Sequence, residues 1–230
     1  MSDAQPNDPH HSGASASPPT PINPVSAVSG LQFERLIFFS DAVMAIAITL
    51  LAVEFRLPSV GQDAEIGPRV LALVPQVQSY ILSFIVIGLY WVDHHRVFSY
   101  IRHLDATLIW LNLLFLLWIG FLPFPTSLIG SYQNERAVLI LYAGTVAMTG
   151  IMRTAIWWYA VHDHRLVDQD LNRRLIRNVL LSGLIPPAIF LASIPVAVFS
   201  PTIVVTAWNL MLAVSFLSSL RPVHHPRPQV

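Results

Sequence analysis

The residues best suited to carry chemistry stand in one apolar stretch, RLIFFSDAVMAIAITLLAVEF, which covers residues 35–55. It contains Arg35, Ser40 and Asp41 near its start and Thr49 near its middle. A carboxylate inside a membrane helix costs about 2.5–3.5 kcal/mol, so we expect Asp41 to serve function or assembly rather than to be merely hydrated at the headgroups. Arg35 and Asp41 lie about 9 Å apart along a helix and on different faces, so each needs a partner in another helix or chain.

Three further polar side chains occur in or beside apolar segments. His94 and His95 are adjacent near the end of the second apolar segment, and Asn112 is the one amide in the third. We expect Asn112 to form a hydrogen bond to another helix, an interaction worth about 0.6–2 kcal/mol in membranes. The two histidines either meet a polar partner between helices or are hydrated by headgroups, and the sequence leaves both interpretations open.

The sequence gives little support for a metal site or an enzyme active site. His162 and His164 flank Asp163 in a loop, but metal sites need several ligands that converge from different parts of the fold. There is no cysteine, which excludes disulfides and thiolate chemistry. We find no convergent catalytic set, and therefore expect no enzyme, no resident metal and no cofactor.

The composition places the chain in a membrane. Hydrophobic residues make up 54% of the 230 residues and charged residues 11%, with a mean hydropathy of +0.58. A soluble domain carries about 25% charged residues. The formal net charge is zero and no basic patch suggests nucleic acid. The sequence therefore predicts an all-α integral membrane protein.

Six apolar stretches have the length of about 20 residues that a bilayer crossing requires. They define a six-helix transmembrane domain at 31–220, between a disordered N-terminal tail at 1–30 and a short tail at 221–230. We expect the PFP sequence at 123–125 to end the third stretch. The stretches are near 33–57, 70–92, 106–128, 136–160, 178–199 and 202–220.

The arginines predict the orientation. With six crossings both termini share one side, and nine arginines fall on that side against three on the other. This bias places both termini in the cytoplasm of a cell-membrane protein. Arg153 lies inside the fourth stretch, and we expect it to extend towards the same cytoplasmic surface.

The first stretch has two different faces when drawn as a helix. At 100° per residue, with Ile46 at zero, Thr49 lies about 60° away and Asp41 about 140° away. The helix thus separates an apolar stripe with one threonine from an acidic face. The other residues of the stripe, within about 40° of Ile46, are Phe39, Ala42, Leu50, Val53 and Leu57.

The spacing Arg-x3-Phe-Ser-Asp, formed by Arg35, Phe39, Ser40 and Asp41, resembles the first helix of the Transmembrane protein 175 family of endosomal and lysosomal potassium channels. The sequences YWVDHHRVFSYI at 90–101 and WLNLLFLLWIGFLPFPT at 110–126 are similar to that family's second and third helices. The resemblance covers about residues 33–220 in order, with one six-helix unit as in prokaryotic members.

The resemblance implies a homotetrameric potassium channel that lacks a TVGYG filter. The first helix of each subunit would line the pore, and by position Ile46 would form the constriction, with Thr49, Leu50 and Val53 beyond it. Transient potassium ions would be the only metal bound. The resemblance further implies a network that supports the pore helix, formed by Arg35, Phe39, Ser40, Asp41, His94, His95 and Asn112.

The sequence is also compatible with a second class of protein. Asp41 and a histidine could relay protons in a proton-coupled transporter or a proton leak. Broken helices and charges at the midplane favour transporters, and the first stretch has neither. The channel is therefore the leading hypothesis, and ion flux separates the two.

Overall fold

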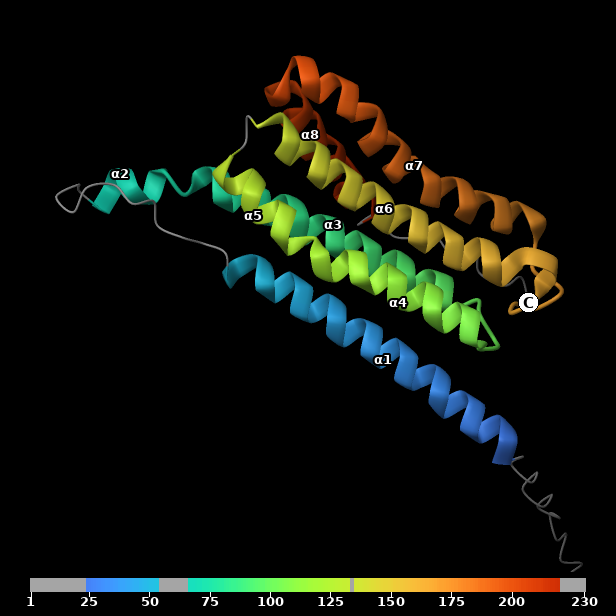
Figure 1. Cartoon of the computed structure of the whole chain (residues 1–230). Helices are drawn as coiled ribbons and strands as arrows, with labels where there is room; N and C mark the ends of the chain where they lie inside the picture. Colours follow the sequence, from blue (N-terminus) through green and yellow to red (C-terminus); the bar gives the residue numbers. More distant parts are fainter. Residues whose placement is uncertain (1–23, 54–65, 133–134, 220–230) are drawn as a thin grey trace, which may run out of the picture.

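The computed structural model describes residues 24–53, 66–132 and 135–219, and this part of the chain is almost entirely helical (Figure 1). Within it, β-pairing is limited to an isolated bridge between Ile101 and Val167. The predicted all-α fold is confirmed. The elements are α1 (Pro24–Val53), α2 (Ile66–Leu71), α3 (Val74–Phe98), α4 (Ala106–Phe121), α5 (Pro123–Ser131), α6 (Arg136–Val161), the 3-10 turn η1 (His162–His164), α7 (Arg173–Phe199) and α8 (Pro201–Ser219).

Five helical stretches of the described chain are long and apolar enough to cross a membrane, and they coincide with the first five predicted crossings. The sixth predicted crossing corresponds to α8, which is helical throughout. α1 begins at Pro24, within the segment 1–30 that was expected to form the N-terminal tail. Residues 1–23 and the predicted C-terminal tail lie outside the described residues. The five stretches are Gly30–Val53, Val74–Phe98, Ala106–Ser131, Arg136–His164 and Arg173–Phe199.

The prediction that the third crossing ends at the PFP sequence was wrong. Leu122 keeps helical dihedral angles of −52° and −38°, and α5 starts at Pro123 and continues to Ser131. Proline is accepted in the first turn of a helix because the backbone N–H groups there have no intrahelical partner. The prolines therefore divide the crossing into two helices.

The helices form a bundle with α6 at its centre. α6 packs most extensively against α7 and also contacts α3, α4 and α5. α1 lies along one edge of the bundle, where it contacts α3, α4 and α5 (Figure 1). One side of α1 is therefore held by the bundle, and the other side meets no described part of this chain.

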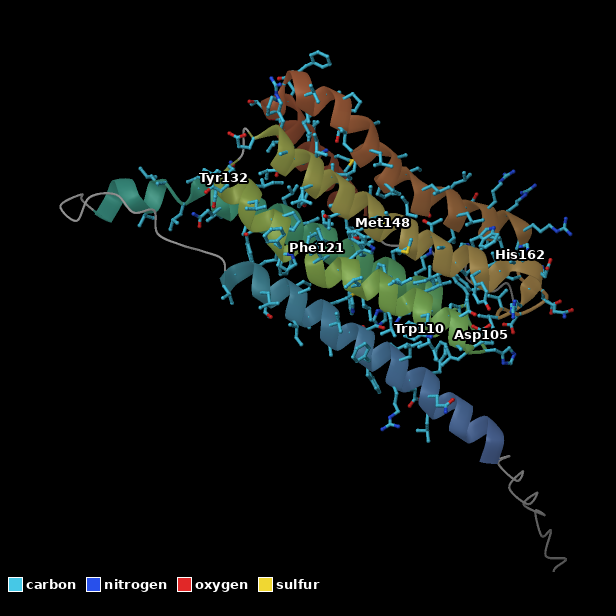
Figure 2. The ribbon with its side chains drawn as sticks, viewed as in Figure 1. Asp105, Trp110, Phe121, Tyr132, Met148 and His162 are labelled. Atoms are coloured by element: carbon cyan, nitrogen blue, oxygen red, sulfur yellow. The ribbon has the colours of Figure 1, made fainter. Side chains whose placement is uncertain are left out.

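The α3–α4 and α6–α7 connections meet at one end of the bundle. The backbone N–H of Arg102 donates to the carbonyl of Leu166 at 2.8 Å, and its Nε lies 3.0 Å from the Asp168 carboxylate. Asp105 caps the start of α4 by accepting from the Leu108 N–H. Figure 2 shows Asp105 and His162 at this end and Tyr132 at the opposite end. These polar contacts fix the position of the α3–α4 connection against the α6–α7 connection at this end of the bundle.

Two glycines let α6 and α7 approach closely. A methyl group on Gly150 would come within 2.9 Å of Pro187 Cδ, and one on Gly183 would lie 2.0 Å from Arg153 Nη1. Small residues at such contacts allow backbones in a membrane to come together, since lipid supplies no hydrophobic driving force between helices. The Arg153 side chain occupies the space that Gly183 leaves.

We expect Gly183→Ala to lower the melting temperature of the purified protein, because the added methyl group displaces the Arg153 guanidinium and separates α6 from α7. Overpacking of this kind costs about 1–3 kcal/mol. Thermal unfolding in detergent measures the effect. Gly144→Ala in α6 is the matched control, since its methyl group would meet nothing within 4 Å. Equal melting temperatures for the two variants would contradict the assignment.

Candidate functional site

α1 is attached to α3 through the carboxylate that the sequence singled out. Trp91 Nε1 donates to Asp41 Oδ1 at 3.0 Å, and His95 Nε2 lies 3.7 Å from Asp41 Oδ2. The Asp41 side chain is one-third exposed. The carboxylate therefore has its partners on another helix, as its position in the sequence required, and it lies at the edge of the buried contact.

A buried hydrogen-bonded chain continues inward from Asp41 and joins three helices. Asn112 Nδ2 in α4 donates to Ser40 Oγ at 2.9 Å, and Asn112 Oδ1 lies 2.9 Å from His94 Nε2 in α3. Ser40 Oγ in turn donates to the Leu36 carbonyl within α1. Because the amide oxygen can only accept, His94 must carry its proton on Nε2. The prediction that Asn112 bonds to another helix is confirmed.

Two aromatic rings hold His94 in this position. Its imidazole stacks on Phe98, with ring centroids 4.2 Å apart, and on Phe115 at 5.5 Å. His94 is buried, and its Nδ1 has no hydrogen-bond partner among the described residues. His94 thus serves the buried chain to Ser40, while His95 faces Asp41. The sequence left open which histidine meets the Phe-Ser-Asp residues, and the structure brings both to them.

The opposite side of α1 carries the predicted stripe. Ile46 is 57% exposed and Val53 72% exposed, and Leu50 and Thr49 are also exposed. Thr49 Oγ1 donates its proton to the Ile46 carbonyl at 2.8 Å, so its lone pairs remain available. Within the chain, therefore, these four side chains share a face that the bundle leaves uncovered.

Two members of the predicted support network stand apart from it. Phe39 is 50% exposed and lies on the stripe side of α1 rather than with Ser40. Arg35 is exposed, and no ion pair joins it to the described part of the chain. The structure brings together Ser40, Asp41, His94, His95 and Asn112, and Trp91, a residue that the predicted network omitted.

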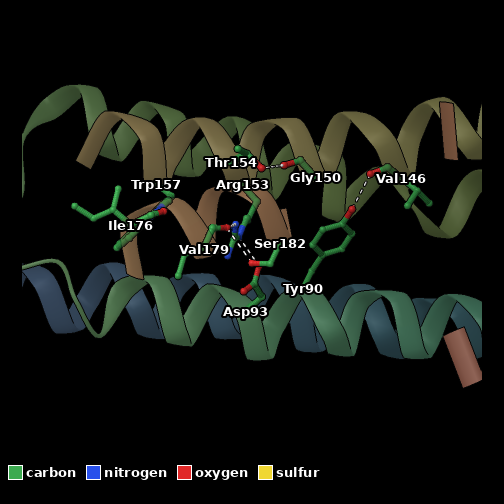
Figure 3. A network of polar contacts seen from close by, with 10 residues as sticks. All are labelled: Tyr90, Asp93, Val146, Gly150, Arg153, Thr154, Trp157, Ile176, Val179 and Ser182. Carbon is green, nitrogen blue, oxygen red and sulfur yellow. Dashed lines mark hydrogen bonds and ion pairs between the residues drawn. The ribbon is translucent and has the colours of Figure 1, made fainter. Parts of the chain in front are cut away.

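The other side of α3 carries a second polar contact, which sequence reasoning missed (Figure 3). Arg153 of α6 does not extend to the surface as expected: it is 2% exposed and its Nε lies against Asp93 Oδ2. Its Nη1 donates to the Val179 carbonyl of α7 at 3.1 Å. The Tyr90 hydroxyl, one turn before Asp93, donates to the Val146 carbonyl at 2.8 Å. The sequence signal for this contact was an arginine inside the fourth predicted stretch, Arg153, and an aspartate directly after the second, Asp93.

The described residues hold no cluster of three or more histidine, aspartate or glutamate side chains suited to a metal. His162 and His164 are the first and last residues of the η1 turn, where His162 contacts Asp163 at 3.5 Å. The polar groups of the bundle are instead engaged with one another between helices. Their arrangement positions helices and is unsuited to bond chemistry.

We expect Asn112→Leu to lower the free energy of unfolding by about 1–3 kcal/mol, because it removes two interhelical hydrogen bonds and leaves the buried His94 Nε2–H without its acceptor and the Ser40 oxygen without its donor. Thermal or denaturant unfolding of the purified protein measures the loss. Thr145→Val is the control, since the Thr145 hydroxyl is buried but bonds only within α6, to the Leu141 carbonyl. A comparable loss in the control would remove the special role of Asn112.

We expect Asp93→Leu to destabilise the protein by about 3–5 kcal/mol, since the Arg153 charge is then buried without its partner. The double variant Asp93→Leu/Arg153→Met should recover most of that loss, because apolar residues of similar volume can replace a buried ion pair. Melting temperatures of both variants and of Arg153→Met test the pair. Additive losses in the double variant would show that the two charges are not coupled.

An all-helical bundle whose edge helix is attached by buried polar groups, and whose described part has five helical stretches long and apolar enough to cross a membrane, has the architecture of a multi-pass membrane protein. A family model described as the endosomal/lysosomal potassium channel TMEM175 matches residues 35–123. A potassium channel of Streptomyces collinus is 34% identical over 138 residues, which are 58% of this chain and 67% of the relative. The chain belongs to the TMEM175 channel family.

Two further likenesses bear on fold and function. The crystal structure of a lysosomal potassium-selective channel TMEM175 homolog from Chamaesiphon minutus matches with a TM-score of 0.72 and 28% identity, over 82% of this chain and 98% of that one. The endosomal/lysosomal proton channel TMEM175 of Danio rerio is 29% identical over 137 residues, which are 59% of this chain and 26% of that protein. The relatives are thus named for two different ions.

Proposed function

We propose that four copies of this chain form a potassium-permeable cation channel whose pore is lined by α1. One observation carries the proposal. The bundle holds α1 by one side only, through Ser40 and Asp41, while the opposite side presents Ile46, Thr49 and Val53 uncovered along the helix. The potassium channel of Streptomyces collinus and the potassium-selective homolog of Chamaesiphon minutus support this choice of ion.

The constriction in this proposal is a ring of Ile46 side chains. Four of them around an axis make a narrow apolar gate, which conducts only when it is wide enough to stay wetted. Thr49 lies one turn further along and has already given its hydroxyl proton to the Ile46 carbonyl. Its oxygen can therefore face a partly dehydrated cation with both lone pairs. Leu50 and Val53 extend the apolar wall beyond it.

The polar contacts to α3 and α4 have a mechanical role in this channel. Widening or narrowing the ring requires α1 to tilt or rotate, and the Ser40–Asn112–His94 chain fixes its rotation about its own axis. Asp41, Trp91 and His95 fix the same helix one residue further along. The channel sits in the cell membrane with both termini in the cytoplasm, on the side where the arginines gather.

We expect Ile46→Asn to raise potassium flux into liposomes by up to about tenfold, the effect of lowering a barrier by about 1.4 kcal/mol, and to reduce discrimination against sodium. The polar side chain wets the constriction. Ala52→Asn is the control: Ala52 is exposed on the same helix but points about 120° away from Ile46. Unchanged flux in Ile46→Asn, or an equal rise in the control, removes Ile46 from the gate.

Proton conduction is a second candidate function, favoured by the 3.7 Å contact between the partly exposed side chains of Asp41 and His95. Two adjacent titratable groups can pass a proton where a metal cation needs a continuous pore. Flux measured in the same liposomes with a potassium gradient, a sodium gradient or a pH gradient separates the candidates. Potassium flux that persists in His95→Gln supports the channel, whereas strictly proton-driven flux that this variant abolishes supports the relay.

A further inference from the structure

A cavity of 280 Å³ lies on the far side of α3 from α1, between α3, α6, α7 and α8. Most of its wall is apolar, and its one end is charged. The apolar wall includes Leu89, Val146, Ile185, Ile189 and Met211, and the charged end is formed by Asp93 and Arg96. No contact described for the pore helix uses this space.

The apolar part of the cavity borders the bilayer. All four helices around it cross the membrane or are predicted to do so. Ile185 is 57% exposed and Ile189 40% exposed, so the α7 wall is shared between the cavity and the lipid-facing surface. A volume of this size admits a flexible hydrocarbon chain, whereas a helix with its side chains is about 10–12 Å across.

The charged end carries a net positive charge. Asp93 is paired with Arg153, so their charges offset one another. Arg96 is exposed and forms no ion pair with a described residue. It lies two residues before the end of α3 at Phe98. Because a crossing helix ends near the membrane surface, we infer that Arg96 lies at the depth of the lipid headgroups. Buried Arg153 also keeps Nη2 without a hydrogen-bond partner in the described chain.

We propose that this cavity binds an anionic phospholipid of the surrounding bilayer, with one acyl chain between α3 and α7 and the phosphate at Arg96. The apolar wall matches the chain, and the unpaired guanidinium at the membrane surface matches the headgroup. Basic pockets between transmembrane helices select anionic headgroups in this way. The Asp93–Arg153 pair orients the polar end and keeps the carboxylate from repelling the phosphate.

The test uses phosphatidylglycerol with a photoreactive diazirine on one acyl chain, added to phosphatidylcholine vesicles that contain the full chain. After irradiation, mass spectrometry locates the labelled peptides. We expect label on cavity-lining residues of α3 and α7, displaced by unlabelled phosphatidylglycerol and not by phosphatidylcholine. In Arg96→Gln the preference for phosphatidylglycerol over phosphatidylcholine should fall about fivefold, since one arginine near the surface contributes about 1 kcal/mol.

A variant that fills the cavity provides the second arm. Ser182→Phe places a ring in the space, and we expect it to lower labelling about tenfold. Ala192→Phe adds the same ring at an exposed position of α7 outside the cavity and should leave labelling unchanged. Size-exclusion chromatography checks folding and assembly of each variant, and Arg96→Gln keeps the test decisive if Ser182→Phe fails to fold.

Three results would overturn the proposal. Equal competition by phosphatidylcholine on the unmodified chain would show that the headgroup is not recognised. Labelling that is the same in Ser182→Phe and in the unmodified chain would place the lipid elsewhere. A Ser182→Phe variant that separates into smaller assemblies without losing label would assign the cavity to contact with a second copy of the chain.

Discussion

The buried amide of Asn112 is the interaction on which the arrangement of the edge helix depends. From α4, it bonds to α1 through Ser40 on one side and to α3 through His94 on the other. In hydrocarbon, each of these donors and acceptors is costly when left alone, so the three helices are constrained to one relative rotation. That rotation turns Ile46 and Val53 away from the bundle. The exposed stripe is thus a consequence of the buried chain.

α3 connects this edge to the rest of the molecule because its two sides bear different polar groups. On one side Trp91 and His95 contact α1 and His94 contacts α4, while on the other Tyr90 and Asp93 contact α6. The second side is closed by Arg153, whose guanidinium fits only because Gly183 has no side chain. A disturbance of the α6–α7 contact would therefore reach the helix that holds α1. The structure gives the edge helix a rigid support.

Much of this architecture was predictable from local properties of the sequence. Hydrocarbon thickness fixes the length of a crossing, so the apolar stretches located the helices, although the start of α1 lies nine residues before the predicted one. The period of the helix placed Ile46, Thr49 and Val53 on one face and Asp41 on another. The cost of burying polar groups indicated that Asp41 and Asn112 must have partners. The expectation failed at the PFP sequence, because proline is accepted in the first turn of a helix and the chain continued as α5 beyond Leu122.

The sequence by itself determined the class of protein, the number and length of its predicted crossings, and the faces of its first helix, because these depend on composition and on a fixed helical period. Only the tertiary structure decided the pairings. Asn112 forms hydrogen bonds to both Ser40 and His94. His95 lies against Asp41, and Arg153 pairs with Asp93 instead of extending to the membrane surface. Such pairings depend on how helices distant in sequence are rotated and set in depth against one another. No single segment carries that information.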